Sequence, residues 1–258
     1  PQPCGACARG QFDMCRNGRY TERGIKEIDG YCSQRWCVET DYAVSVDNGL
    51  RDVGMLIEPT TVVAKAWEQV RRVGQRAYFD PERALITGAG PIGLLAALLA
   101  VQQGLDTHIL DRVTDGPKPG IAAALGATEV VDPSTEPAME AWRRVDGRRR
   151  VVVFEAVGVP GMLDEAIAAA PRQSQIVVVG VCMVPDTIRP MVAVGKEVNL
   201  QFSFGYDPME FAESLRRIAE GEVDVEAMVT GEVDLDGVPG AFEALGSPDQ
   251  HAKILVVP

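Results

Sequence analysis

The stretch Arg83-Ala84-Leu85-Ile86-Thr87-Gly88-Ala89-Gly90-Pro91-Ile92-Gly93 decides the fold of this chain. Its first residues are apolar and end at a glycine turn, which is typical of a short strand buried in a parallel sheet. Beyond the turn, apolar residues recur at the spacing of one helical face: Ile92, Leu95, Ala96 and Leu99. The pattern therefore predicts a buried strand, a tight turn and an amphipathic helix.

The glycines of the turn fit the pattern G-x-G-x-x-G. Gly88 would allow the tight turn, Gly90 would let the backbone approach a pyrophosphate, and Gly93 would let the helix pack on the strand. The phosphates would meet the free N–H groups at the positive end of the helix. A second predicted strand, residues 107–110, ends at Asp111, 23 residues after Gly88, where a carboxylate can accept both ribose hydroxyls of an adenosine. All these elements together indicate a dinucleotide site.

Strands and helices alternate from residue 83 onward. Further strands are predicted at 127–131, 151–154, 175–181 and 200–204, and further helices at about 119–125, 137–144 and 160–170. This order is typical of an α/β protein with a doubly wound parallel sheet. Ligands bind at the carboxyl ends of such strands. The residues that this rule adds to the rim are Glu155, Val157, Gly158, Gly180 and Val181.

The composition is that of a globular protein, with 46% hydrophobic and 24% charged residues in a chain of 258. The net charge of −12 argues against nucleic acid and anionic membranes as partners. The longest apolar run, residues 91–101, is too short to span a bilayer, and no signal peptide is recognisable. We therefore expect a cytoplasmic protein with a small-molecule partner.

The six cysteines are mostly confined to the first 37 residues. Cys4 and Cys7 have C-x-x-C spacing and Cys15 follows, an arrangement in which thiolates can meet one tetrahedral zinc ion. Three cysteines are one short of a closed structural site. The candidates for a fourth ligand are Asp13, Cys32 and Cys37. The alternative interpretation is a group of reduced thiols without metal.

The segments that flank the alternating region follow other patterns. Residues 30–38 and 42–46 alternate like strands, which predicts antiparallel β structure. A helix is predicted from Glu58 to about residue 73, and on the residues alone Glu58 is an ordinary acid at the positive helix end. After a helix at 208–219, residues 229–258 are predicted as strand, helix and strand, the last rejoining the antiparallel part.

Two further sets of residues receive a structural interpretation. The arginine cluster at 143–150 is typical of a solvated turn rather than an anion site. His108 and His251 have no ligand-like neighbours in the sequence, so we interpret both as structural.

At this point the sequence resembles the zinc-dependent medium-chain alcohol and polyol dehydrogenases, in particular their glucose-dehydrogenase-like branch. The features that carry the resemblance are the lobe Cys4…Cys15, the stretch 24–30, Glu58-Pro59 and the glycine turn at 88–93. The resemblance implies a Rossmann domain, residues 62–206, inserted in a partial GroES-like β catalytic domain, residues 1–61 and 207–258. It also implies hydride transfer between NAD(P) and a secondary alcohol, polyol or sugar, with zinc polarising the oxygen. We expect such an enzyme to be a homo-oligomer.

The resemblance also assigns residues. Glu58 would be the third ligand of a catalytic zinc, and Cys4, Cys7 and Cys15 would hold a structural zinc. Asp111 favours NAD over NADP. The cofactor-binding residues would be Gly88, Gly90, Pro91, Ile92, Gly93, Asp111, Arg112, Glu155, Val157, Gly158, Gly180 and Val181.

This chain departs from the family pattern at several positions. The cysteine lobe is shortened where a third cysteine of the usual four would stand. Gln34 replaces an expected glutamate, and Gly205 stands where archaeal glucose enzymes have an asparagine. The first two catalytic zinc ligands of the family lie upstream of the cysteine lobe, at which this chain begins. We therefore expect a chain that lacks the N-terminal segment and is inactive alone. The alternatives are a non-catalytic dinucleotide-binding module and a zinc-free quinone-reductase-like enzyme.

Overall fold

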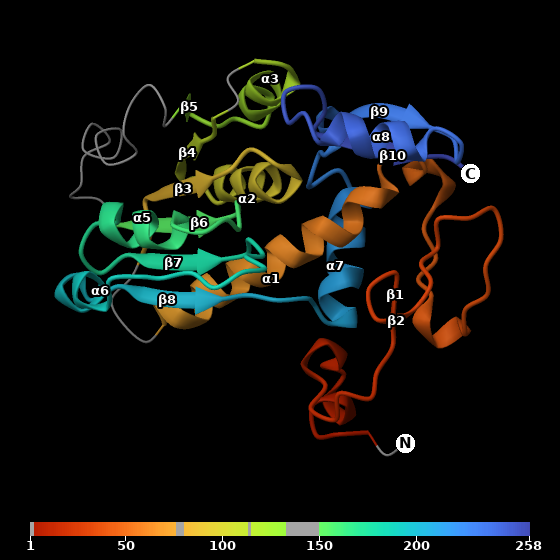
Figure 1. Ribbon diagram of the computed structural model, residues 1–258, viewed down its shortest axis with the longest axis horizontal. Helices are drawn as coiled ribbons and strands as arrows, with labels where there is room; N and C mark the ends of the chain where they lie inside the picture. Colours follow the sequence, from red (N-terminus) through yellow and green to blue (C-terminus); the bar gives the residue numbers. More distant parts are fainter. Residues whose placement is uncertain (1–2, 76–79, 113–114, 133–149) are drawn as a thin grey trace.

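The computed structural model describes residues 3–75, 80–112, 115–132 and 150–258 (Figure 1). The helix expected at 137–144 and four arginines of the cluster lie outside these ranges. None of the helices that the structure describes is long and apolar enough to cross a membrane.

The centre of the molecule is a parallel sheet of six strands in the order β5-β4-β3-β6-β7-β8. The bounds of the strands are β3 Arg83–Thr87, β4 Asp106–Leu110, β5 Glu129–Val131, β6 Val151–Glu155, β7 Gln175–Val178 and β8 Asn199–Phe202. Figure 1 shows them stacked from β5 at the top to β8 at the bottom. The order reverses between β3 and β6, as in a doubly wound Rossmann sheet. The predicted fold class is confirmed.

Helices cover both faces of this sheet. Residues of α1 (Ile57–Gly74), α2 (Pro91–Gln102) and α3 (Pro117–Ala124) share one buried core with alternate strand residues such as Ile86 and Phe154. The intervening residues, such as Leu85 and Val153, form a second core with α5 (Met162–Ala169), and α6 (Pro190–Lys196) adds partly buried residues to it. Burial on both faces explains why these strands are apolar throughout.

The helix α2 differs from its prediction. The sequence pattern indicated one apolar face, but residues 93–100 are buried all round. The reason is that α1 packs beside α2 on the same face of the sheet, where the ring of Trp67 lies 4.7 Å from that of Phe154 in β6 and its indole nitrogen donates a hydrogen bond to the Ala96 carbonyl at 3.4 Å. A helix covered on every side needs no polar face.

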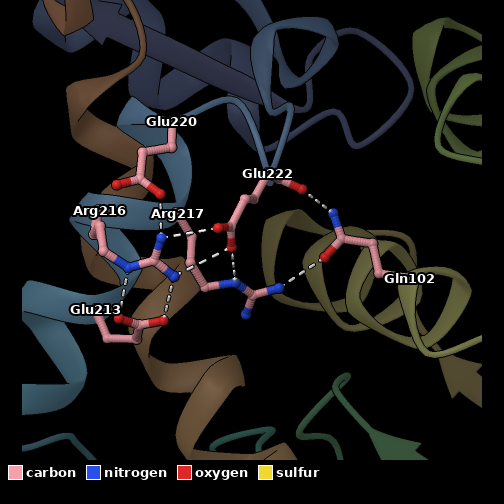
Figure 2. Close-up of polar contacts among 6 residues, drawn as sticks. All are labelled: Gln102, Glu213, Arg216, Arg217, Glu220 and Glu222. Atoms are coloured by element: carbon pink, nitrogen blue, oxygen red, sulfur yellow. Dashed lines mark hydrogen bonds and ion pairs between the residues drawn. The ribbon is translucent and has the colours of Figure 1, made fainter.

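The helix α7 (Pro208–Ala219) packs along α1, and its Ile218 joins the same core as β3 and β6. Figure 2 shows how the end of α7 is fixed to the end of α2. Arg217 donates to the Gln102 side-chain oxygen at 2.9 Å, and Gln102 donates to the carbonyl of Glu222 at 2.6 Å. Arg216 is held among three carboxylates, those of Glu213, Glu220 and Glu222.

The antiparallel β structure predicted for residues 30–46 is wrong. The described strands of this region are only β1 (Glu22–Arg23) and β2 (Glu27–Ile28), and residues 29–47 form loops and the 3-10 turn Thr40–Tyr42. The apolar side chains that produced the alternating pattern stay at the surface: Trp36 is 54% exposed and Tyr42 is 74% exposed. An alternating pattern specifies a strand only where a partner buries one face.

The pairing predicted for the last strand is also wrong. β10 (Lys253–Val256) pairs in parallel with β9 (Val229–Val233), and α8 (Val238–Leu245) connects them. The two strands form a separate sheet, drawn in blue at the upper right of Figure 1. Strand, helix and parallel strand in succession form a local β-α-β unit, so β10 takes its partner from its neighbour in sequence.

Candidate functional site

The glycine turn after β3 has the geometry that its pattern predicts. Gly88 has a φ of +86°, which favours glycine, and its N–H donates to the Leu110 carbonyl at 2.7 Å. A β-carbon on Gly93 would collide with the carbonyl oxygen of Gly88. A β-carbon on Gly90 would meet no atom within 4 Å, so open space lies beside the backbone at the start of α2. This is where a pyrophosphate would approach the helix N-terminus.

The loop after β6 forms the next part of the rim and touches the glycine turn. The Glu155 side chain is buried, and its carboxylate accepts hydrogen bonds from the N–H groups of Val157 and Gly158, both at 2.8 Å. The Glu155 carboxylate therefore shapes the loop. Val157 is 40% exposed, and a β-carbon on Gly88 would lie 3.1 Å from its side chain.

The loop after β7 closes against the loop after β6. Gly158 has a φ of +71°, and a β-carbon on it would lie 2.5 Å from the Val181 nitrogen. The N–H of Gly180 donates to the Glu155 carbonyl at 2.9 Å. Val181 itself is 69% exposed. The structure thus brings the predicted residues of these loops together at the carboxyl ends of β3, β6 and β7.

Asp111 follows β4 on the same rim. Its carboxylate accepts a hydrogen bond from the Ala89 N–H inside the glycine turn, so the acid and the turn hold each other in place. Asp111 is partly exposed, and Arg112 beside it is exposed. Both residues thus follow the carboxyl end of β4, the end of a parallel strand at which ligands bind in this class of fold.

The sequence analysis did not select Lys118, which lies in the first turn of α3. Its side chain is only 6% exposed, and no hydrogen bond or ion pair to its ammonium is seen among the described residues. α3 begins at Pro117, shortly after β4 ends at Leu110. A cation is electrostatically unfavourable at a helix N-terminus. A lysine in the first turn of the predicted helix was the sequence signal for this buried cation.

Glu58 lies in the first turn of α1, beside residues from three other segments. The hydroxyl of Tyr206, in the connection from β8 to α7, donates a hydrogen bond to its carboxylate. Partial desolvation raises the pKa of Glu58 despite the nearby charge of Lys253 in β10. Desolvation and the charge of Glu58 raise the pKa of Tyr206 to about 12. Glu22 of β1 adds further negative charge to this group. A carboxylate in this position can attract a cation or a proton.

Cys4, Cys7 and Cys15 form the second candidate centre. Their sulfur atoms all lie within 4.8 Å of one another, and those of Cys4 and Cys7 are 3.5 Å apart. Hydrogen bonds from the N–H groups of Cys7 and Arg16 lower the pKa of Cys4 to about 6, whereas its thiol neighbours raise the pKa of Cys7 to about 11. Three converging sulfurs fit three corners of a tetrahedral zinc site.

The proposed fourth ligands do not join these three sulfurs in the described part of the chain. Cys32 and Cys37 are exposed and lie outside the group. The side chain of Asp13 is not among the described ones. Each of the two histidines lies next to a polar group of the protein itself. The Nε2 atom of His108 is 3.0 Å from a carboxylate oxygen of Asp106, and the Nδ1 atom of His251 is 3.2 Å from the Thr230 hydroxyl.

The fold and the rim define a protein with a Rossmann-type nucleotide-binding architecture. A family model described as "Glucose dehydrogenase C-terminus" matches residues 51–256. The chain belongs to the glucose dehydrogenase branch of the zinc-dependent medium-chain alcohol and polyol dehydrogenases.

Individual proteins of known structure or activity agree with this assignment. Glucose 1-dehydrogenase of Methanocella arvoryzae is 41% identical over 127 residues, which are 49% of this chain and 35% of that protein. Sorbitol dehydrogenase of Bacillus subtilis is 27% identical over 264 residues, which are 99% of this chain and 70% of that one. Glucose dehydrogenase of Haloferax mediterranei, solved in complex with NADP, Zn and gluconolactone, has a similar fold. Its TM-score is 0.84 at 24% identity, covering 99% of this chain and 72% of that one. The matched part of this chain spans about a third of the length of the Methanocella arvoryzae enzyme.

Proposed function

We propose that this chain belongs to an oxidoreductase that transfers hydride between a nicotinamide dinucleotide and a secondary alcohol, polyol or sugar. The observation that carries the proposal is the open space beside Gly90, framed by Gly88, Gly93 and Asp111. When bound, the nicotinamide would exchange the hydride and zinc would polarise the substrate oxygen. The family membership supports this reaction class.

The chain's own residues would bind and orient the cofactor in a fixed order along the rim. The first-turn N–H groups of α2 would hold the pyrophosphate, with Pro91 fixing the start of the helix and Ile92 following it. Asp111 and Arg112 would meet the adenosine ribose. Val157 and Val181, which are exposed next to the turn, would pack against the nicotinamide half. Glu155, Gly158 and Gly180 would keep the two loops in the shape that this requires.

Glu58 would act as one ligand of a catalytic zinc, with Tyr206 holding its carboxylate in place. Cys4, Cys7 and Cys15 would hold a second, structural zinc. We also infer the domain division expected above, with residues 62–206 binding nucleotide and residues 1–61 and 207–258 forming a partial GroES-like catalytic part. The protein would function as a homo-oligomer.

Two alanine substitutions test the cofactor site. Gly90→Ala adds a methyl group into open space, so it should leave the unfolding midpoint unchanged while blocking the pyrophosphate. We expect the Kd for NADH, measured by nicotinamide fluorescence, to rise at least tenfold, which is about 1.4 kcal/mol. Gly240→Ala on α8 also enters open space and is the matched control. Unchanged NADH affinity in Gly90→Ala would contradict the proposed pyrophosphate position.

A further inference from the structure

A cavity of about 540 Å³ lies at the opposite end of α2 from the glycine turn. Its lining comes from the C-terminal half of α1, the end of α2, Asp80 and Pro81 before β3, and Arg217 near the end of α7. Because a helix rises about 1.5 Å per residue, Gln102 in this lining lies about 16 Å along α2 from Pro91 in the glycine turn. Pockets for small molecules have volumes of about 300–1,000 Å³. The cavity is therefore large enough for a small ligand and separate from the proposed cofactor site.

Part of the cavity lining is apolar and held in place by the core. Trp67, Val70 and Leu99 contribute to it and are all less than 10% exposed, at 7%, 4% and 3%. The ring of Trp67 packs against Phe154, and its indole nitrogen donates to the Ala96 carbonyl. Trp67 therefore offers only its ring to the cavity. Such a lining suits an apolar or aromatic group of a ligand.

Among the residues that the structure describes, the charged ones that line the cavity are Glu68, Arg71, Asp80 and Arg217. Two of these neutralise each other, since Arg71 donates to both carboxylate oxygens of Glu68, each at 2.8 Å. Arg72, which lies outside the lining, donates to the same carboxylate at 2.8 Å. The charges available to a ligand therefore belong to Arg217 and Asp80.

Arg217 has a guanidinium nitrogen to spare. Its Nη2 donates to the Gln102 side-chain oxygen at 2.9 Å, and its Nε lies 3.5 Å from a carboxylate oxygen of Glu222. Figure 2 shows the third nitrogen, Nη1, without a partner among the residues drawn, and it has none in the rest of the described chain. Glu222 is held more closely by Arg216, at 2.8 Å. Arg217 is thus a partly buried cation that can still donate to an anionic group.

Asp80 supplies the opposite charge. Its carboxylate is exposed and has no hydrogen bond or ion pair with any other described residue. α1 and α2 both end at the cavity, so the partial negative charges of their C-termini add to that of Asp80. This part of the lining favours a cationic group such as an ammonium.

We propose that the cavity binds a free α-amino acid with an apolar or aromatic side chain. The carboxylate of the ligand would accept a hydrogen bond from Nη1 of Arg217, its ammonium would face Asp80, and its side chain would pack on Trp67. A zwitterion matches one positive and one negative group, whereas a simple anion or cation would meet one group of its own sign. The bound amino acid would contact both α2 and α7, and so link two helices that belong to different proposed domains. The inference goes beyond the proposed reaction and does not depend on it.

Three related compounds test the two charges of the ligand. L-Tryptophan carries both, tryptamine lacks the carboxylate, and indole-3-propionate lacks the ammonium. By isothermal titration calorimetry, the wild type should bind L-tryptophan at least about tenfold more tightly than either analogue. Arg217→Gln should weaken L-tryptophan at least about tenfold and leave tryptamine unchanged, because tryptamine has no carboxylate to lose a partner. Asp80→Asn should weaken L-tryptophan similarly and leave indole-3-propionate unchanged.

Arg172→Gln is the matched control, since this exposed arginine donates to the Gly195 carbonyl at 2.7 Å and lies outside the cavity. It should bind all three compounds as the wild type does. Circular dichroism and NADH affinity should be the same in all variants, which separates this site from the proposed cofactor site. The proposal is overturned if the wild type binds neither L-tryptophan nor L-leucine at millimolar concentration. It is also overturned if an analogue binds as tightly as L-tryptophan, or if Arg217→Gln and Asp80→Asn leave L-tryptophan binding unchanged.

Discussion

Gly180 lies directly against Gly158 where the loops after β6 and β7 meet. A β-carbon on Gly180 would come within 2.5 Å of the Gly158 nitrogen and 2.6 Å of the Glu155 carboxylate. Neither neighbour can move easily, because the carboxylate already accepts hydrogen bonds from the Val157 and Gly158 N–H groups. One close approach between two glycines therefore fixes the shape of the proposed nicotinamide side of the rim.

We expect Gly180→Ala to lower the free energy of unfolding by about 1–3 kcal/mol, because the methyl group must displace backbone. It should also weaken NADH binding. Gly195→Ala on α6, where a β-carbon meets no atom, is the matched control and should change neither quantity. Urea unfolding and NADH titration of both variants measure the two effects. A fully stable Gly180→Ala would show that the two loops are not held together as described.

The cofactor preference should depend on Asp111. A 2′-phosphate about 4 Å from its carboxylate would cost on the order of 4 kcal/mol per unit charge at an effective dielectric constant near 20. Exposed Arg112 would offset part of this repulsion. We expect NAD to bind at least about tenfold more tightly than NADP, and Asp111→Asn to reduce the ratio. Asp115→Asn, on the same connection, is the control. Equal binding of NAD and NADP by the wild type would refute this prediction.

The two glutamates of α1 should respond oppositely to pH. The pKa of Glu58 is raised in the folded chain by desolvation, so its ionised form costs stability. That cost is absent below the carboxyl pKa of the unfolded chain and complete above the folded pKa. Because Glu58 is exposed and its charge is screened by solvent, Glu58→Gln should raise the free energy of unfolding near pH 7 by only about 0.2–1 kcal/mol, and the difference should vanish in acid.

Glu68, on the same helix, provides the control of opposite sign. Burial opposes its ionisation, but hydrogen bonds from Arg71 and Arg72 outweigh that effect and lower its pKa. The ionised Glu68 carboxylate therefore stabilises the folded chain. This stabilisation is fully present above the pKa that Glu68 has in the unfolded chain, and it is lost as the pH falls through the pKa that Glu68 has in the folded chain. Glu68→Gln should lower the free energy of unfolding near pH 7 by about 0.3–0.5 kcal/mol. Thermal melts from acidic to neutral pH would measure the stability change of each variant. A change of the same sign in Glu58→Gln and Glu68→Gln would disprove the opposite pKa shifts of the two glutamates.

The cysteine centre should bind zinc weakly. Cys4, with its pKa near 6, is largely thiolate at neutral pH and is prepared for a metal. Three sulfurs are one fewer than a closed structural site uses, so we expect less than one zinc per chain after purification under reducing conditions. Zinc titration should show weaker binding in Cys4→Ser and no change in Cys32→Ser. One tightly held zinc per wild-type chain would mean that another residue completes the site.

The sequence predicted those helices, strands and turns whose conformation is determined by residues within the same short segment. β3, α2 and β4 were recognisable because a strand buried on both faces is apolar throughout and the turn needs glycine at fixed positions. α7 was predicted with its observed bounds, since Asp207 and Glu210 form a capping box at its start. The glycine roles followed for the same reason: the clash at Gly93 and the space at Gly90 are properties of one turn.

Features that depend on distant partners were not predictable in this way. Tertiary packing decides whether Trp36 is buried against another sheet, and it decides with which strand Lys253 of β10 pairs. A local sequence pattern does not contain this information. The short α6 escaped the analysis because seven residues give too little periodicity. The hydrogen bond between Tyr206 and Glu58 joins residues 148 positions apart, and the sequence around neither residue predicts this contact.

The surroundings of Glu58 also bear on the order in which the molecule is made. They combine β1, α1, the residue after Gly205 and β10, so a nascent chain carries Glu58 for another 195 residues before Lys253 is synthesised. The parallel core around β3 can collapse on the ribosome well before that point, because its strands leave earlier. Contacts of such long range form late. The glycine turn and its neighbouring loops would thus be assembled first, and Glu58, the proposed zinc ligand, would acquire its final environment only when synthesis is nearly complete.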